Sequence, residues 1–252
     1  KTLVVATSVS GNTKEILTIL ETAKKTECKI IGFSSGGEME KYCIKHKIEF
    51  RKIEKIHSPR ASLVNFLYGI LKILKPIIPI KDRDILESIE KMHLLRNNIY
   101  SKNLLKGNKS LDLAEWISGI SLIYYPFGLQ SVATRFKNCL QENAKTHAIT
   151  EDVVESSHNG IVAWEKKSAV QPILLIGKDD YFKTKERWNI LKEYFDKKEI
   201  ESREIVSENG NILTKIINLI YLLDYATIYY AVISKVDPSP VESIHFIKKR
   251  LE

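Results

Sequence analysis

Short apolar runs and apolar residues at helical spacing follow one another along the first fifty positions of the chain. A short apolar run over Leu3–Thr7 is typical of a buried strand, and the residues after it repeat with the three- and four-residue spacing of a helix. A strand–helix–strand–helix–strand order predicts a doubly wound α/β fold, with a parallel sheet covered by helices on both faces. The expected elements after the first strand are the helix containing Ile16, Leu17, Ile19, Leu20 and Ala23, a strand over Lys29–Ser34, a helix over Met39–His46 and a strand over Ile48–Ile53.

The second half of the chain predicts another α/β unit. A helical run over Ala61–Leu74 and a charged, helical connection over residues 80–109 precede it. We therefore divide the chain into a first lobe with its connection, residues 1–109, and a second lobe with C-terminal helices, residues 110–252. The elements expected in the second lobe are strands over Ile120–Tyr125, Pro172–Gly177 and Ile200–Val206 and helices over Gln130–His147, Lys183–Lys197, Ile212–Ser234 and Val241–Leu251.

Two long apolar runs require a membrane test. The run over residues 63–80 is interrupted by two lysines and two prolines. The run over residues 216–233 is shorter than the ~20 residues of a typical span and carries Asp224 in its middle, where a carboxylate would be costly in lipid. Both runs favour buried or interfacial helices, so we expect no membrane partner.

Composition narrows the possible partners and the compartment. The chain has 252 residues, 44% hydrophobic and 28% charged, with a formal net charge of +8 and a pI near 9.2, which favours anionic ligands. Its lysines are scattered, and no zinc-finger spacing or nucleic-acid module is visible, so we expect no nucleic-acid partner. Cys28, Cys43 and Cys139 show no CxxC spacing and indicate free thiols in a cytoplasmic protein.

The turn after the first strand is rich in hydroxyl groups. Ser8, Ser10 and Thr13 surround Gly11 and Asn12, immediately before the first helix. A helix N-terminus presents backbone N–H groups and the positive end of the helix dipole, and Gly11 lets the backbone approach an anion closely. The turn lacks a Lys after a second Gly and therefore does not match a nucleotide-triphosphate loop. It favours a phosphate monoester, with an ordinary capped turn in which Thr13 caps the helix as the alternative.

The segment Ser8-Val9-Ser10-Gly11-Asn12-Thr13-Lys14-Glu15 resembles the Ser-x-Ser-Gly-x-Thr-x-Glu signature of sugar isomerase (SIS) domains. In that family the hydroxyls hold the phosphate of a sugar phosphate, which implies the same role for Ser8, Ser10 and Thr13. An SIS domain also has an earlier strand with a glycine-rich turn, so we expect the first lobe to lack its N-terminal strand here. The resemblance thus implies two SIS-type lobes, the first of them incomplete.

A second segment narrows the resemblance. His57-Ser58-Pro59-Arg60-Ala61-Ser62-Leu63 is similar to the Pro-Arg-Ala segment of archaeal bifunctional phosphoglucose/phosphomannose isomerases, whose arginine reaches into the active site. From the residues alone, an arginine after a proline turn is either a fixed guanidinium for phosphate or sugar oxygens or a surface ion pair.

Residues 135–145, Arg-Phe-Lys-Asn-Cys-Leu-Gln-Glu-Asn-Ala-Lys, resemble the Arg-Phe-Lys-Asn-x-x-x-Glu-Asn-Ala-Lys segment of the same isomerases. Helical periodicity alone places Glu142 on the solvated side, opposite the apolar positions. The resemblance instead implies that Glu142 moves the proton between C1 and C2. Gln141 departs mildly from the family, which often has Asn there.

Two more residues are assigned through the resemblance. Ser156-Ser157-His158-Asn159-Gly160 is similar to the family's His-Asn signature, which implies that His158 assists ring opening, although Gly160 stands where the family usually has Glu. The C-terminal segment is also similar, and its register implies that Lys248, or else Lys249, points into the active site. Without the resemblance, each would be interpreted as a surface residue.

The resemblance implies an isomerase that interconverts glucose 6-phosphate, and mannose 6-phosphate, with fructose 6-phosphate. Glu142 would be the base and His158 the ring-opening group, with Arg60 and Lys248 supplying positive charge near the oxygens. The resemblance also implies that the enzyme uses no cofactor and no metal. It further implies a homodimer in which His158 belongs to the active site of the neighbouring subunit. A non-catalytic sugar-phosphate sensor on the same fold and an isomerase for another sugar phosphate are the alternatives.

Overall fold

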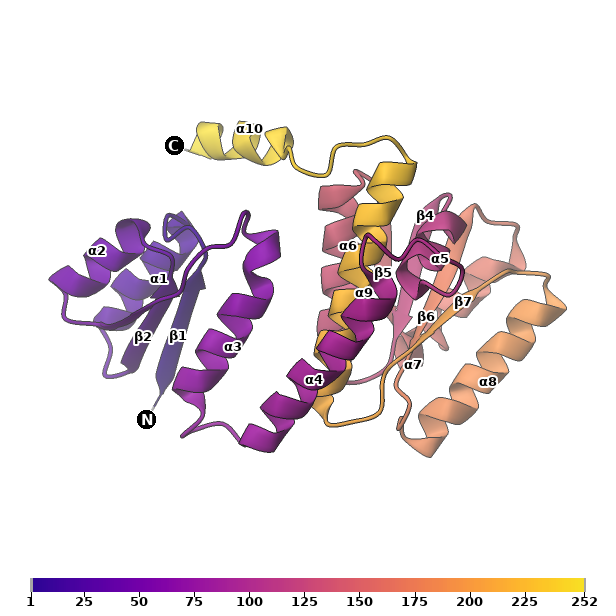
Figure 1. Cartoon of the computed structure of the whole chain (residues 1–252), viewed down its shortest axis with the longest axis horizontal. Helices are drawn as coiled ribbons and strands as arrows, with labels where there is room; N and C mark the ends of the chain where they lie inside the picture. The colour runs from indigo at the N-terminus through magenta and orange to yellow at the C-terminus, as the bar shows by residue number, and fades with distance from the viewer. Residues whose placement is uncertain (1, 252) are drawn as a thin grey trace. The chain divides into compact units, whose positions relative to one another are not determined.

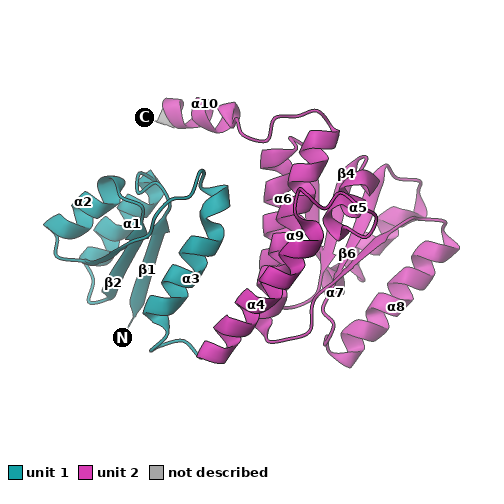
Figure 2. Cartoon of the chain, in the orientation of Figure 1, with its two compact units in different colours: residues 1–80 teal, residues 81–252 magenta. Residues whose placement is uncertain are grey.

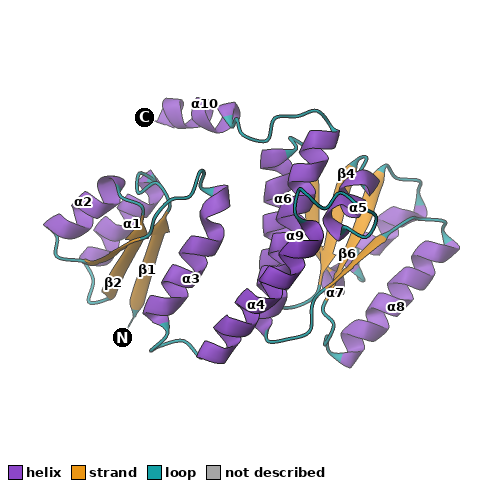
Figure 3. Cartoon of the chain, viewed as in Figure 1, coloured by secondary structure: helices purple, strands orange, loops and turns teal. Residues whose placement is uncertain are grey.

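The computed structural model describes residues 2–251, which divide into two compact units. Unit 1 covers residues 1–80 and unit 2 covers residues 81–252 (Figure 2). Both contain a parallel sheet flanked by helices, which confirms the predicted fold class (Figure 3).

Unit 1 is a three-stranded sheet in the order β1-β2-β3. Side chains alternate across the central strand, so that Ile30 packs on one face while Ile31 and Phe33 pack on the other. The first face carries α1 and α2, and the second carries α3 through Phe66. The elements of unit 1 are β1 (Leu3–Ser8), α1 (Lys14–Lys24), β2 (Lys29–Ser34), α2 (Gly37–Lys45), β3 (Glu49–Lys52), the short helix η1 (Arg60–Ser62) and α3 (Leu63–Leu74).

Unit 2 is built on a four-stranded parallel sheet in the order β5-β4-β6-β7, so β5 is added on one side of β4 and β6 on the other. One face of this sheet carries an aromatic core in which Trp164, Trp188 and Phe195 bring η2 and α8 onto Tyr124. The elements of unit 2 are α4 (Asp82–Ile99), α5 (Lys109–Trp116), β4 (Ile120–Tyr125), α6 (Gln130–Asn143), β5 (Ala148–Asp152), α7 (Val153–Ser156), η2 (Gly160–Glu165), β6 (Val170–Ile176), α8 (Phe182–Lys197), β7 (Arg203–Val206), α9 (Ile212–Ile233) and α10 (Glu242–Leu251).

The long apolar helix α9 is the centre of the helical layer of unit 2. It packs against α4, α5 and α6, and these helices lie around it in Figure 1. By length and mean hydropathy (1.6) it could cross a membrane, but half of that apolar window is buried inside the protein. Its N-terminus is capped by the Asn211 side chain, which accepts a hydrogen bond of 3.1 Å from the Thr214 N–H. Packing against three helices therefore accounts for its apolar character.

Two boundaries differ from the sequence-based expectation. We divided the chain at residues 109 and 110, whereas the compact units divide after Ile80, because α4 packs on α9 within unit 2. The predicted helix over Gln130–His147 ends at Asn143, and the strand β5, which we did not predict, follows it. Residues 148–152 contain few apolar residues because β5 is a short edge strand beside β4.

Candidate functional site

The hydroxyl-rich turn of unit 1 is held closed by its own side chains. The hydroxyls of Ser8 and Thr13 lie 2.8 Å apart, and the Gly11 N–H donates to the Ser8 Oγ at 3.1 Å. Ser8 ends β1 and is buried, while Thr13 immediately precedes α1 and makes no capping hydrogen bond with its side chain. The Asn12 N–H also donates to the Ser10 Oγ at 3.2 Å. The structure thus brings Ser8, Ser10 and Thr13 together at the start of α1.

Gly11 is required by the packing of this turn. It has a φ of +71°, and a Cβ added there would lie 1.7 Å from the Gly36 carbonyl oxygen. The turn after β1 therefore rests directly on the turn after β2, a contact that leaves no room for any side chain. This close approach explains why a glycine occupies the middle of the motif.

Arg60 lies on the short helix η1, also in unit 1. The buried Ser62 hydroxyl fixes this segment, since it accepts from the Ile56 N–H at 2.9 Å and donates to the Ser58 carbonyl oxygen at 2.8 Å. Arg60 is half-buried at the start of the helix that Ser62 ends. The loop is thereby ordered by a local hydrogen-bond network.

In unit 2, Glu142 lines a cavity of about 640 Å³ between the end of α6 and the segment that enters α10. Glu142 is half-buried, so the solvated position inferred from periodicity alone does not describe it. A carboxylate on the wall of a cavity can reach a molecule bound in that cavity. The cavity is lined by Gln141, Glu142, Lys145, Thr146, His147, Pro240, Val241, Glu242, Ser243 and Ile244.

Lys145 is a cavity residue that the sequence analysis did not single out. Its ammonium group donates to the Glu142 carbonyl oxygen at 2.5 Å and to the Pro240 carbonyl oxygen at 2.9 Å. Lys145 has a φ of +56°, which ends α6 and turns the side chain back across the helix end. Its place in the Glu-Asn-Ala-Lys segment was visible, but its left-handed conformation was not. Lys145 thus joins both walls of the cavity.

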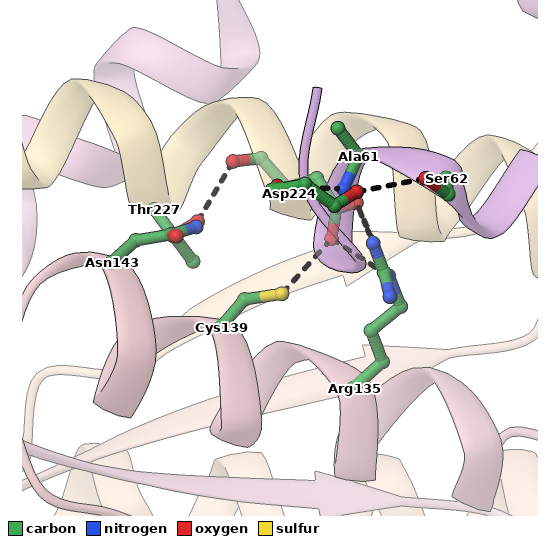
Figure 4. Close-up of polar contacts among 8 residues, drawn as sticks. Ala61, Ser62, Arg135, Cys139, Asn143, Asp224 and Thr227 are labelled. Atoms are coloured by element: carbon green, nitrogen blue, oxygen red, sulfur yellow. Dashed lines mark hydrogen bonds and ion pairs between the residues drawn. The ribbon is translucent and has the colours of Figure 1, made fainter. Parts of the chain in front are cut away.

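The helix α6 is fastened to α9 by a polar cluster (Figure 4). The Arg135 guanidinium donates to the Asp224 carboxylate, with Nε–Oδ1 at 3.0 Å and Nη2–Oδ2 at 2.5 Å. The Cys139 thiol lies 3.5 Å from Asp224 Oδ1, and burial raises the pKa of that thiol to about 12. Burial also raises the pKa of the Asp224 carboxyl, although the adjacent Arg135 acts to lower it. Asn143 bonds to Thr227 at the C-terminal end of the same stripe.

His158 and Lys248 lie elsewhere in unit 2. His158 is exposed in the turn after α7, where its backbone N–H donates to the Glu155 carbonyl oxygen at 2.9 Å. Its side chain does not line the Glu142 cavity. Lys248 and Lys249 are exposed in the last turns of α10, and the cavity lining reaches only the first residues of that helix. The chain therefore does not bring His158 or Lys248 to Glu142 within unit 2.

Gly160, which stands where the resembling family usually has Glu, lies beside the Glu151 carboxylate. A Cβ at Gly160 would lie 2.4 Å from the Glu151 Oε1. Burial, together with the neighbouring charge of Glu155, raises the pKa of Glu151. The carboxylate of Glu151 thus occupies the space beside Gly160 that another side chain would need.

Comparison with known sequences relates this chain to sugar-phosphate enzymes. Residues 106–251 match the family described as the bacterial phospho-glucose isomerase C-terminal SIS domain. A bifunctional phosphoglucose/phosphomannose isomerase from Caldicellulosiruptor bescii is 30% identical over 267 residues, covering 100% of this chain and 76% of the relative. The Aquifex aeolicus protein of the same description is 28% identical, covering 99% of this chain and 76% of the relative.

A relative with a different description is a D-glucosamine-6-phosphate 4-epimerase from Sulfolobus acidocaldarius, 27% identical and covering 70% of this chain and 55% of the relative. Among solved structures, the tagatose-6-phosphate ketose/aldose isomerase from Escherichia coli superimposes with a TM-score of 0.73 at 12% identity, covering 95% of this chain and 71% of that one. A glucose-6-phosphate isomerase like protein from Thermus thermophilus superimposes with a TM-score of 0.67 at 14% identity, covering 94% of this chain and 73% of that one. At these identities the structures show a shared fold.

Proposed function

Since the chain belongs to the family of bifunctional phosphoglucose/phosphomannose isomerases, we propose how its own residues carry out that family's reaction. The protein is an aldose–ketose isomerase that acts on glucose 6-phosphate and mannose 6-phosphate, with fructose 6-phosphate as the ketose. The residues assigned below are our proposal.

The sugar phosphate binds through its phosphate at the start of α1. Ser8, Ser10 and Thr13 converge there, and the first turn of an eleven-residue helix directs its dipole at the same point. Thr13 supports this role because its side chain does not cap the helix. The net charge of +8 favours an anionic substrate in addition.

Glu142 is the base, and its position on the wall of the 640 Å³ cavity is the observation that carries the proposal. In the open-chain aldose it takes the proton from C2, and the electrons of the C2–H bond form the C1–C2 double bond of an enediolate. The C1 carbonyl electrons move onto O1 in that step, and the hydroxyl proton on O2 then moves to O1. Returning the carbon-bound proton to C1, as the C2–O2 double bond forms, gives the ketose. Arg60 supplies positive charge for the enediolate oxygens, and His158 transfers the proton that opens the ring. Lys248, which does not line the Glu142 cavity, is assigned to the same charge-supplying role through the family resemblance alone.

The test is Glu142→Gln, which keeps the shape of the side chain and removes its basicity. We expect turnover of glucose 6-phosphate to fall by about 10²–10⁴-fold, the contribution of a general base, while KM changes little. Glu193→Gln is the matched control, since Glu193 is an exposed helical glutamate of α8 paired with Lys197. Equal turnover in both variants would show that Glu142 is an ordinary helix-surface residue.

The enzyme works as a homodimer with composite active sites. His158 lies outside the Glu142 cavity of its own unit, which fits a histidine that serves a two-fold mate. Mixing Glu142→Ala and His158→Ala proteins under conditions that re-pair subunits tests this. Random pairing gives about half mixed dimers, each with one intact site, so about a quarter of the wild-type activity should return. If no activity returns, both residues belong to one chain's site.

The three cysteines are free, and none of them pairs in a disulfide, which supports a cytoplasmic enzyme.

A second candidate function follows from the 27% identity to an epimerase of an amino-sugar phosphate. Incubation with glucosamine 6-phosphate, followed by NMR of the product, distinguishes that activity from isomerisation of mannose 6-phosphate and glucose 6-phosphate. A sugar-phosphate sensor would bind all three and convert none.

A further inference from the structure

Glu142 lies in a part of the helix that hydrogen bonding alone does not hold firmly. The helix α6 ends at Asn143, so Glu142 is in its last turn, where carbonyl groups lack partners inside the helix. The Glu142 carbonyl oxygen accepts from the Lys145 ammonium group instead. A general base must nevertheless stay within hydrogen-bond reach of the proton it takes. Contacts outside α6 therefore help to fix this turn, and Lys145, which bonds to the Glu142 and Pro240 carbonyl oxygens, is one of them.

The neighbouring residue provides such a contact. The Asn143 side-chain amide donates to the Thr227 Oγ1 at 2.8 Å, and the Thr227 hydroxyl donates to the Asp224 carbonyl oxygen at 2.8 Å (Figure 4). Because the threonine hydroxyl has one proton and gives it to that carbonyl, it can only accept from Asn143. Asn143 is 7% exposed and Thr227 is fully buried, so water does not compete for either group. The bond has a defined direction and a single geometry.

The same face of α6 carries the rest of the attachment. Arg135, Cys139 and Asn143 follow at intervals of four residues and therefore form one stripe along the helix. The first two contact the Asp224 carboxylate, and the third contacts Thr227 one turn further along α9. The ion pair near the middle of α6 fixes the rotation of the helix, and the Asn143–Thr227 bond fixes its end.

We propose that Asn143 and Thr227 are positioning residues that hold the last turn of α6 so that the Glu142 carboxylate stays in reach of the substrate. The inference rests on the proposed function, in which Glu142 is the base. Thr227 lies on α9 and does not line the cavity. Its effect on the reaction passes through Asn143 to the adjacent Glu142.

The test replaces Thr227 with valine, which has nearly the same shape and lacks the hydroxyl. We expect kcat to fall about tenfold or more and KM to change less than about threefold, because a small misplacement of a reacting group costs rate rather than binding. Thr227→Ser, which restores the hydroxyl, should recover most of kcat. Ser110→Ala is the matched control: it removes another buried hydroxyl bond to α9, from Ser110 Oγ to the Leu222 carbonyl oxygen at 2.7 Å, on the α5 side of that helix.

Circular dichroism and the melting temperature establish that each variant is folded. Should Thr227→Val not fold, Asn143→Ala removes the same hydrogen bond from the other partner and should show the same loss of kcat. Equal kcat values for Thr227→Val and Ser110→Ala, or failure of Thr227→Ser to recover, would mean that Thr227 acts only through stability and would overturn the proposal.

A double substitution separates this inference from the proposed function. In a Glu142→Gln background, Thr227→Val should have almost no further effect, since no base remains to be positioned. If Glu142→Gln alone is inactive while Thr227→Val has wild-type kcat, the base assignment stands and the positioning role fails. If Glu142→Gln retains full turnover, the base assignment fails and this inference fails with it.

Discussion

The ion pair between Arg135 and Asp224 offers a direct measurement of what holds α6 to α9. Arg135→Met keeps the unbranched, apolar part of the side chain and removes its charge. The Asp224 carboxylate, 29% exposed, would then face the Cys139 thiol at 3.5 Å in place of a guanidinium bonded through both Nε and Nη2. An uncompensated carboxylate in this position must lower the free energy of unfolding.

The size of the effect follows from burial. Removing one partner of a fully buried ion pair costs about 3–5 kcal/mol, and exposures of 18% and 29% allow water to relieve part of this. We expect a loss of about 2–3 kcal/mol at pH 7. For a unit of 172 residues (81 to 252), this corresponds to a fall in melting temperature of about 4–12 °C.

The loss should depend on pH in a defined direction. Burial already raises the pKa of the Asp224 carboxyl, and Arg135 is the group that lowers it, so its removal raises that pKa further. A carboxyl whose pKa in the folded state exceeds its unfolded value favours folding below the unfolded pKa and loses that contribution as pH rises through the folded pKa. The difference between wild type and Arg135→Met should therefore shrink as the pH falls from 8 towards 4.

Urea denaturation followed by circular dichroism at several pH values measures this difference, with the transition of unit 2 analysed separately from that of unit 1. The matched variant is Arg135→Met combined with Asp224→Leu, which removes both charges and should recover most of the stability. A loss below about 0.5 kcal/mol at pH 7, or a loss that grows on acidification, would refute the reasoning.

Two further substitutions test local packing. Gly11→Ala should abolish binding of inorganic phosphate measured by calorimetry, because the added Cβ would lie 1.7 Å from the Gly36 carbonyl oxygen. The control Gly107→Ala, at a φ of +99° with open space around it, should bind phosphate normally, and equal binding by the two variants would contradict this. Gly160→Glu should lower the melting temperature more than Gly160→Gln at pH 8, because it adds a second carboxylate beside Glu151, whose pKa is already raised. At pH 5, where these carboxyl groups begin to protonate, the melting temperatures of the two variants should become similar. A pH-independent difference would show that size rather than charge matters.

The hydroxyl-rich turn and the strand before it could be predicted because their causes are local. Ser8, Ser10 and Thr13 lie within six residues of one another, and the strand and helix on either side of them place them together. The central strands of both sheets were also predictable, since burial on both faces selects apolar residues. The edge strand β5 was not, because an edge strand needs few apolar residues.

The environment of Glu142 could be determined only by the tertiary structure. Helical periodicity reports which side of α6 packs on the sheet, and Glu142 is on neither that side nor the fully solvated one. The cavity beside it is closed by residues 240–244, about a hundred positions further along the chain. Sequence spacing carries no information about such a contact, so only the resemblance to a family selected Glu142 beforehand.

The sequence by itself determined the fold class, the hydroxyl-rich turn and most of the elements, since these depend on apolar runs, on the helical period of 3.6 and on short motifs. Tertiary structure decided where α6 ends, to which unit α4 belongs and what holds Glu142 in place. The Asn143–Thr227 bond joins residues 84 positions apart, and the Arg135–Asp224 pair joins residues 89 apart. Such partners are chosen by the packing of whole helices, which no local pattern along the chain records.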